Sequence, residues 1–470
     1  MKLPEIIQGG MGVYVSTPFL ARAVALCGGL GTVSGVAVSH VFAYILQHGD
    51  PGGHYRRALE AFPFPDIAER VRATYFIEGG IEQYKKYHKV PVFSLHPPRN
   101  LIELTICANF AMVWLAKEGH DHPISINYLE KVQMPHLYSF FGAMLADVDV
   151  ITIGAGIPLQ VPGILDAFAS GRSAEYRMTV EGSSGPAVQM VFDPKTFFNK
   201  GSFSLKRPKF LPIVSSDKLA EILLSKKASG KMDGFVAELP TAGGHNAGPR
   251  GNPKLFNEYG EPIYGEKDKI NFERLHSLGL PFWIGGALAN PDGLRYAQGV
   301  GAAGIQAGSI FALAQESALN DEQKRFIRKM GFRNNLRIIT SEWSPTGFPF
   351  KVIELPGTLS DKATYAGRKR ICNLSYLVSL FRRPDGVIVS RCGAEPEGKY
   401  LHKGGTLEGS QDKRCLCNGL LSAVTLGHPN EPQIFTLGDD VRFLQALMQN
   451  EDDSYTVSDA MKYLLNKDCL

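Results

Sequence analysis

GFVAELPTAGGH, residues 234–245, joins a strand-sized apolar run to a turn of small residues that ends in a histidine. The run 234–237 is short and mostly apolar, which is typical of a strand buried on both faces. The same order of apolar run, glycine turn and helical stretch returns at residues 281–286 and 304–309. Repeated units of this kind predict parallel βα folding rather than a sandwich or a bundle.

Eight such runs alternate with helical stretches along the first 320 residues. They are residues 5–8, 31–36, 123–129, 148–153, 210–214, 234–237, 281–284 and 304–306. Eight βα units close a barrel. The predicted fold class is therefore α/β, a (β/α)8 TIM barrel over residues 1–320.

Two connections are much longer than the usual loop of about 2–6 residues. The insertion after strand 2, residues 38–122, has helical patterns of its own, and the insertion after strand 4, residues 155–209, has the pattern of a hairpin over the barrel mouth. Both are expected to act as lids. The βα alternation stops after residue 320, so residues 321–470 are expected to form an appended C-terminal subdomain.

The composition argues against several classes of partner. The sequence has 50 lysine and arginine residues and 46 acidic residues, and it contains no run of basic residues. Nucleic acid is therefore not expected to bind. The first residues lack the pattern of a signal peptide, and no window reaches the ~20 uninterrupted apolar residues of a membrane span. We expect a cytoplasmic protein without a membrane partner. The helical insertions leave self-association into a homo-oligomer open.

The candidate catalytic residue is His245. The carboxyl ends of barrel strands form the active face, so a residue in this turn is expected to point at a bound ligand. An imidazole with an unperturbed pKa of about 6.5 can move a proton at neutral pH. The alternative is a loop histidine that caps a helix or binds a carbonyl group, and the chain contains 12 histidines.

Glycine turns mark the expected phosphate and ring sites of a cofactor. Gly285-Gly286 ends the seventh strand and Gly308-Ser309 follows the eighth, where barrels commonly hold a phosphate on backbone N–H groups. The first strand ends in a glycine-rich loop whose Met11 thioether can lie against an aromatic ring. This loop lacks the G-x-G-x-x-G spacing, which disfavours a dinucleotide-binding Rossmann domain. The alternative is that these glycines serve only as tight-turn residues.

Taken in order, these motifs resemble the nitronate monooxygenase family, formerly called 2-nitropropane dioxygenases, whose superfamily includes FMN-containing enoyl-thioester reductases. The resemblance rests on residues 7–12, 26–31, 242–245, 285–286 and 304–309. The later segments 344–351, 370–372, 391–392 and 414–418 resemble a longer subgroup that includes the stand-alone enoyl reductases of polyunsaturated fatty-acid and polyketide synthases. One departure is the first loop, which has Gly-Gly-Met-Gly where many monooxygenases have Pro-Met-Ala.

The resemblance implies a non-covalent FMN and a set of residues around it. Asn127 and Lys209 are similar to polar residues that touch the flavin ring in relatives, and a cation there would stabilise the anionic reduced ring. The glycine turns of the seventh and eighth strands would hold the phosphate. The implied cofactor-binding residues are Gly10, Met11, Gly12, Asn127, Lys209, Ala242, Gly243, Gly244, Gly285, Gly286, Gln306, Gly308 and Ser309.

The resemblance leaves the reaction open between two oxidoreductase activities. In the first, a nitronate monooxygenase-like oxidation of alkyl nitronates with O2, His245 removes the proton α to the nitro group or orients the nitronate. In the alternative, an enoyl-thioester (enoyl-ACP) reductase of fatty-acid or polyketide biosynthesis, NAD(P)H reduces FMN and His245 stabilises or protonates the enolate. The substrate is then a small molecule or an acyl thioester. A third hypothesis is a non-catalytic flavin-binding partner of a synthase.

Four of the seven cysteines gather in the last hundred residues, at Cys372, Cys392, Cys415 and Cys417. Four thiolates are enough for a tetrahedral zinc or an iron–sulfur cluster. The spacing is not C-x-x-C, and a C-x-C pair can equally be two packed thiols. Both interpretations stay open, and reduced thiols are expected elsewhere.

Overall fold

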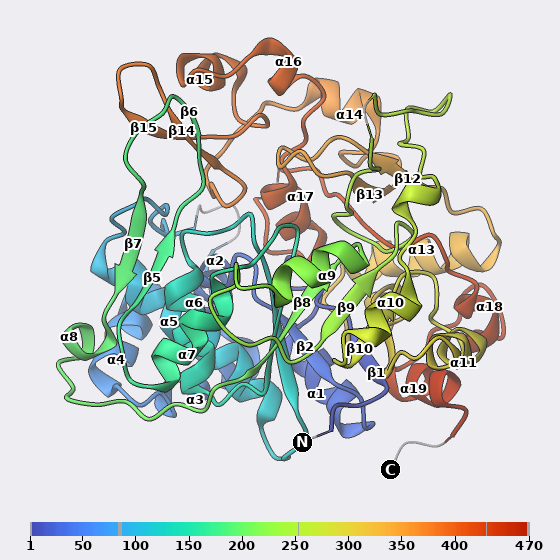
Figure 1. Ribbon diagram of the computed structural model, residues 1–470, viewed down its shortest axis with the longest axis horizontal. Coiled ribbons are helices and arrows are strands. Elements are labelled where there is room, and N and C mark those ends of the chain that lie inside the picture. Colours follow the sequence, from blue (N-terminus) through green and yellow to red (C-terminus); the bar gives the residue numbers. More distant parts are fainter. Residues whose placement is uncertain (1, 83–86, 252, 429, 468–470) are drawn as a thin grey trace.

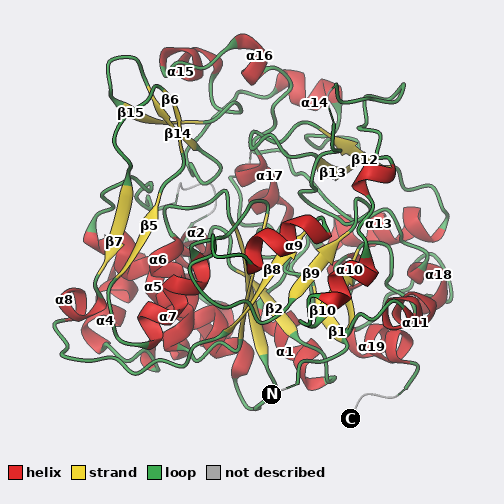
Figure 2. Cartoon of the chain, in the orientation of Figure 1, coloured by secondary structure: helices red, strands yellow, loops and turns green. Residues whose placement is uncertain are grey.

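The computed structural model describes residues 2–82, 87–251, 253–428 and 430–467, and eight parallel strands lie at its centre (Figures 1 and 2). The observed strands overlap the eight predicted runs, with ends that differ by at most two residues. The predicted strands are confirmed as β1 (Ile6–Gln8), β2 (Gly31–Ser34), β3 (Ile124–Leu129), β4 (Val150–Gly154), β8 (Lys209–Val214), β9 (Phe235–Glu238), β10 (Phe282–Gly285) and β11 (Gly304–Ala307).

The eight strands form one closed ring. Their order in the sheet is β1-β11-β10-β9-β8-β4-β3-β2, and every neighbouring pair is parallel. A parallel bridge between Ile7 and Leu30 joins the two ends, where Leu30 N–H donates to Ile6 O at 2.9 Å. The predicted (β/α)8 barrel is confirmed.

Apolar side chains fill the amino-terminal end of the barrel. Leu3, Ile7, Leu30, Leu211 and Trp283 belong to one buried cluster there, together with Val150. The indole Nε1–H of Trp283 donates to the carbonyl of Pro4 at 2.9 Å, which satisfies the polar atom of this buried ring. Because this end is packed solid, a ligand can enter the barrel from the carboxyl ends of its strands.

Helices surround the barrel, and the last one comes from the far end of the chain. α19 packs against both α1 and α11, so it occupies the place of the eighth barrel helix. The chain beyond residue 320 therefore returns to complete the ring of the barrel, and both ends of the chain lie at the bottom of Figure 1. The ring consists of α1 (Pro18–Leu26), α5 (Arg99–Lys117), α6 (His136–Leu145), α7 (Val161–Ala169), α9 (Asp217–Leu224), α10 (Phe272–Ser277), α11 (Pro291–Gly299) and α19 (Val457–Leu465).

The first insertion is helical, as its sequence pattern predicts. Its last helix, α5, packs against β2, β3, α1 and α6, so it is the barrel helix between β2 and β3. The others, which pack on or near α5, are α2 (Val38–Gln47), the short 3-10 helix η1 (Pro51–Gly53), α3 (His54–Glu60) and α4 (Pro65–Tyr75).

The second insertion contains the predicted hairpin, but not over the mouth of the barrel. β5 (Ala174–Arg177) and β7 (Gln189–Phe192) pair in antiparallel fashion and pack against α6 and α7. Between them, β6 (Val180–Gly182) pairs with β14 (Ser379–Arg382) of the C-terminal region. The hairpin lies on the outer side of the barrel helices because its buried face, Tyr176, Met190 and Phe192, joins their apolar core.

The C-terminal region covers the top of the molecule in Figure 1. It contains two small antiparallel pairs, β12 (Ile338–Ser341) with β13 (Phe350–Ile353) and β14 with β15 (Ile388–Arg391).

None of the described helices is long and apolar enough to cross a bilayer. The remaining elements are α8 (Pro194–Phe198), η2 (Glu266–Asp268), α12 (Ser309–Ala312), α13 (Asp321–Phe332), α14 (Lys362–Gly367), α15 (Glu397–His402), α16 (Leu407–Ser410), α17 (Leu416–Ala423) and α18 (Phe443–Leu447).

Candidate active site

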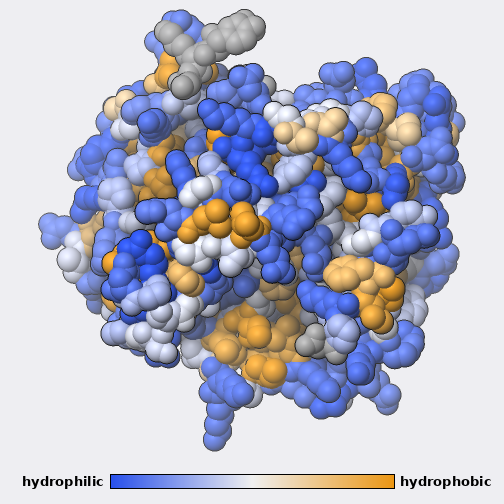
Figure 3. All heavy atoms as spheres, turned by 90° about the horizontal axis from the view of Figure 1, so that it is seen from above, coloured by the Kyte–Doolittle hydropathy of each residue, from blue (hydrophilic) through white to orange (hydrophobic). Residues whose placement is uncertain are grey.

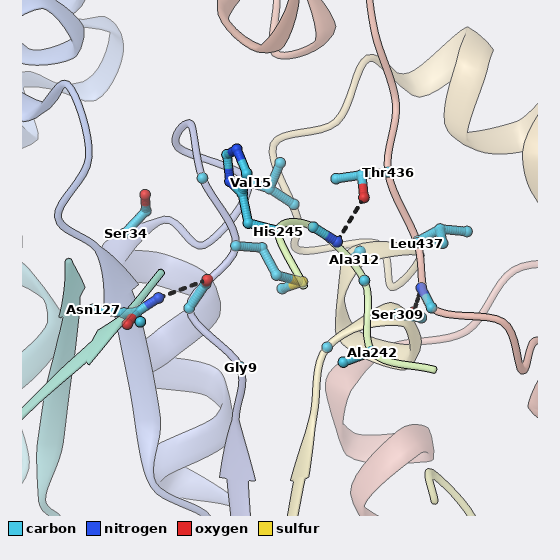
Figure 4. Close-up of a pocket in the computed structure, with 18 of the residues that line it drawn as sticks. Gly9, Val15, Ser34, Asn127, Ala242, His245, Ser309, Ala312, Thr436 and Leu437 are labelled. Atoms are coloured by element: carbon cyan, nitrogen blue, oxygen red, sulfur yellow. Dashed lines mark hydrogen bonds between the residues drawn. The ribbon is translucent and has the colours of Figure 1, made fainter. Parts of the chain in front are cut away.

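One cavity at the carboxyl ends of the barrel strands gathers nearly all of the predicted site residues. Counted with the solvent at its mouth, it has a volume of 1720 Å³. In Figure 4, Asn127 and Ser34 lie on one side, Ser309 and Leu437 lie on the other, and His245 lies between them at the upper edge. The predicted residues that line it are Gly10, Met11, Gly12, Asn127, Ala242, Gly243, Gly244, His245, Gly285, Gly286, Gln306, Gly308 and Ser309.

The first glycine loop is held in place from two sides. The hydroxyl of Ser16 donates to Gly9 O at 3.2 Å and accepts the N–H of Met11 at 2.9 Å. On the other side, Asn127 Nδ2 donates to Gly10 O at 3.0 Å, as the dashed line in Figure 4 shows. A Cβ added to Gly10 would lie 2.2 Å from the Cβ of Asn127, so only glycine permits this approach.

The glycine turns after β10 and β11 border the same cavity, and the β11 turn lies beside the first loop, where Gly9 N–H donates to Ala307 O at 2.7 Å. Gly286 has φ of 117°, and a Cβ there would lie 2.8 Å from Thr241 Oγ1. That Thr241 hydroxyl is buried and has no hydrogen-bond partner among the described residues, and the same holds for the Ser34 hydroxyl. Both belong to residues of the cavity wall, where a bound ligand can supply the missing partner.

The charge around the cavity restricts how it can hold an anion. Glu238, His245 and Asp440 line it, and no described lysine or arginine does. A phosphate here would therefore be bound by backbone N–H groups and hydroxyls rather than by a cationic side chain.

His245 is fixed at the edge of the cavity. Its Nε2 lies 2.7 Å from the buried Ser344 hydroxyl, and its ring packs edge-on against Phe350, 4.8 Å between centroids. The N–H of Gly244 donates to Thr436 Oγ1 at 2.9 Å, which holds the turn itself. Burial lowers the pKa of His245 to about 4, so the imidazole is neutral at pH 7. The residue as a whole is half-buried and lines the cavity.

The prediction that Lys209 touches the flavin ring is wrong. Lys209 is the first residue of β8, and its N–H donates to Asp149 O at the amino-terminal end of the barrel. Five further residues at about 3.3 Å each put the carboxyl end of that strand about 16 Å away. The sequence placed the lysine correctly before the fifth strand, but a residue there lies at the amino-terminal end of the barrel, away from the cavity.

The expectation that the two insertions act as lids is also not borne out. Apart from Ala155, no described residue of 38–122 or 155–209 lines the cavity. A segment near the C-terminus, residues 434–440, takes that place, and we call it the C-terminal strap. Gly438 N–H donates to Ser309 Oγ at 2.8 Å, and Asp439 N–H donates to Thr241 O at 3.0 Å. The strap is thus hydrogen-bonded to the turn after β9, which contains Thr241, and to Ser309 after β11.

The structure brings the four C-terminal cysteines together, but not as a metal site. Cys415 Sγ accepts a hydrogen bond from Asn418 Nδ2 at 3.4 Å. A hydrogen bond from Cys392 lowers the pKa of Cys372 to about 6, whereas the pKa of Cys392 is raised. In the described part of the chain, no group of three or more His, Cys, Asp or Glu side chains is arranged to hold a metal ion. Of the two interpretations that the sequence left open, the described residues show the packed thiols and do not show a zinc or iron–sulfur site.

Several functional positions were not found from the sequence. Ser344 lies in a segment that contributes to the family resemblance, but nothing in its sequence context marks it as a partner of His245. The C-terminal strap has no motif at all. Glu238 lies within residues 234–245, and its acidic side chain at the end of an apolar strand is a signal that could have marked it.

Comparisons with known proteins support the barrel fold. No protein-family model and no curated protein matches the chain. Among solved structures, FabK from Thermotoga maritima is 16% identical with a TM-score of 0.50, over 98% of this chain and 92% of that one. A nitroalkane oxidase from Streptomyces ansochromogenes is 11% identical with a TM-score of 0.45, over 99% and 95%. The likeness to FabK shows a shared fold.

Proposed function

We propose that this protein is an FMN-dependent oxidoreductase. The observation that carries the proposal is the meeting of three glycine turns and His245 in one cavity at the carboxyl ends of the strands. The fold is that of FabK, an enoyl-ACP reductase, and the sequence motifs resemble a flavin-dependent superfamily. The cavity opens at the carboxyl ends of the strands, where a barrel binds its cofactor and substrate.

The residues present fit FMN. Gly285, Gly286, Gly308 and Ser309 would hold its phosphate, and Gly10, Met11 and Gln306 would lie along its ring. The unpartnered hydroxyls of Thr241 and Ser34 are available to its polar atoms. When bound, FMN supplies reversible two-electron redox chemistry. Asn127 holds Gly10 O and would keep the first loop in place beside the bound ring.

The cavity wall favours an enoyl thioester as the substrate. Leu416, Leu420, Ile434, Phe435 and Leu437 present an apolar surface from α17 and the C-terminal strap. An acyl chain gains from burial against such a wall, at about 0.8 kcal/mol for each buried CH2 group. Reduction by NAD(P)H would then give the saturated thioester. In this reaction His245 binds the thioester carbonyl oxygen and stabilises the enolate.

Oxidation of alkyl nitronates with O2 is the second candidate, and the state of His245 favours it. A base must be unprotonated to remove the proton α to a nitro group, and burial keeps this imidazole neutral at pH 7. The third hypothesis, a non-catalytic flavin-binding partner of a synthase, predicts that FMN is retained without turnover. A cytoplasmic location, the absence of nucleic-acid and membrane partners, and homo-oligomer formation stay predictions from the sequence.

Anaerobic reduction of the FMN-loaded protein tests the proposal. If the protein is an enoyl reductase, NADH or NADPH bleaches the visible flavin band and an enoyl thioester restores it. If it oxidises nitronates, propionate 3-nitronate reduces the flavin and the nicotinamides do not. Loss of both reactions in a protein that retains FMN supports the scaffold hypothesis and refutes enzymatic activity.

The variant His245→Ala tests the assigned role within the same assay. We expect it to bind FMN like the wild type and to lose turnover by a factor of about 10²–10⁴, the usual contribution of a positioned acid or base. His276→Ala is the matched control, because His276 is an exposed histidine of α10 that does not line the cavity. Full activity in His245→Ala would show that the assignment is wrong.

A further inference from the structure

A carboxylic acid at the end of β9 lies between two cavities. Glu238 lines the active-site cavity and also a smaller hollow of 280 Å³. Among the described residues it is the one that both linings share. The hollow is bordered by polar side chains of Ser215, Arg250, Tyr264 and Asp268, and Arg250 is exposed to solvent. Glu238 thus has the active-site cavity on one side and, on the other, a small polar hollow whose lining includes the exposed residue Arg250.

The carboxyl group of Glu238 has no hydrogen bond or ion pair with any described residue. Arg250, the nearest candidate for a cationic partner in the hollow, donates instead to Lys267 O at 2.8 Å and to Ser215 O at 2.6 Å. Burial raises the pKa of Glu238 to about 8, so the group carries a proton at pH 7. The ionisable groups around it, from its own loop, the loop after it and the C-terminal strap, are His245, Arg250, Tyr264, Asp268 and Asp440.

The proposed reduction requires a proton that His245 is poorly suited to supply. Adding a hydride to the β-carbon of an enoyl thioester leaves an enolate, whose electron pair must form a new C–H bond at the α-carbon. A neutral imidazole whose pKa is about 4 is rarely present as the imidazolium acid at pH 7. Its Nε2 also shares a hydrogen bond with Ser344.

We propose that Glu238 is the proton donor of the active-site cavity and that the hollow beside it reloads the carboxylate from solvent. The O–H bond of Glu238 breaks, directly or through one water, as the α-carbon gains its hydrogen. The carboxylate that remains takes a proton from water in the hollow, and the hydride comes from NAD(P)H. This assignment rests on the enoyl-reductase form of the proposed function.

The first test uses the protein without cofactor. Infrared difference spectra of wild type and Glu238→Gln should show a protonated carboxyl C=O band that only the wild type has and that disappears as the pH rises through about 8. Glu258→Gln is the matched control, because Glu258 is exposed in the loop that follows His245 and lines neither cavity. Absence of this band at pH 7 overturns the proposal.

The second test uses the FMN-loaded protein and an enoyl thioester. Wild-type turnover should fall as the pH rises through about 8, because the donor then loses its proton. Glu238→Gln should lose turnover by about 10²-fold or more and lose this pH dependence, while Glu238→Asp recovers part of both. An active wild type with an equally active Glu238→Gln variant overturns the inference and leaves the proposed function standing. A wild type without enoyl-thioester turnover overturns that form of the function, and the proton-donor role with it.

Discussion

Replacing Gly286 by alanine should damage both the fold and the cofactor site. At φ of 117° an L-residue is strained, at a cost of about 1–3 kcal/mol. The new Cβ would lie 2.8 Å from Thr241 Oγ1, 2.9 Å from Leu239 Cβ and 3.1 Å from Ala242 N, and forcing a methyl into such a packed position costs about 1–3 kcal/mol more. The expected loss of about 2–6 kcal/mol is a large part of the about 5–15 kcal/mol that stabilises a typical protein.

Urea unfolding of the cofactor-free protein measures this loss, and a fluorescence titration with FMN measures the effect on binding. Gly285→Ala is the matched control for the unfolding measurement. The nearest atoms to its added Cβ lie at 3.7 Å, an ordinary contact distance, and its backbone is that of a strand. The control should unfold within about 0.5 kcal/mol of the wild type. Should Gly286→Ala unfold at the wild-type midpoint and bind FMN with the wild-type affinity, the reasoning about this turn is refuted.

Two further predictions concern His245 and a second buried histidine. Ser344→Ala removes the partner of His245 Nε2 inside the protein, so we expect a loss of about 1–3 kcal/mol in urea unfolding and reduced turnover with unchanged FMN affinity; an unchanged unfolding midpoint would contradict this hydrogen bond. Burial lowers the pKa of His136 to about 3, below the about 6.5 of an unfolded chain. Its contribution to stability is therefore complete above pH 6.5 and falls as the pH drops below that value. Relative to His136→Gln, which does not titrate, the wild type should lose up to about 1.4 kcal/mol per pH unit in unfolding experiments between pH 6 and 4, and a constant difference would disprove the assignment.

The parts of the site that follow the barrel strands could be predicted from the sequence. A glycine turn directly after a strand must lie at the carboxyl end of the barrel, so the positions of Gly10, Gly286 and Gly308 follow from chain connectivity alone. Asn127 was predicted to contact the cofactor, and it lines the cavity because it lies in the carboxyl-terminal half of β3. The flavin contact predicted for Lys209 failed although its position before the fifth strand was predicted correctly, because a residue that precedes a barrel strand lies at the end opposite the cavity.

The parts of the site that come from remote segments could not be predicted. The lid was expected from the long insertions, yet the C-terminal strap covers the glycine turns through Gly438 and Asp439. Ser344 reaches His245 across 99 residues of sequence, and Thr436 reaches Gly244 across 192. No local pattern encodes such a pairing, because it depends on how the chain after residue 320 returns over the barrel.

The sequence alone determined the eight strands, the closure of the barrel and the glycine turns of the candidate flavin site, because hydrophobic period and glycine placement act within a few residues. Only the tertiary structure decided the ionisation of that site. His245 is neutral and Glu238 holds a proton at pH 7 because burial disfavours the charged form of each side chain. Burial is a property of the whole packed chain, and it sets the free energy of each charged form.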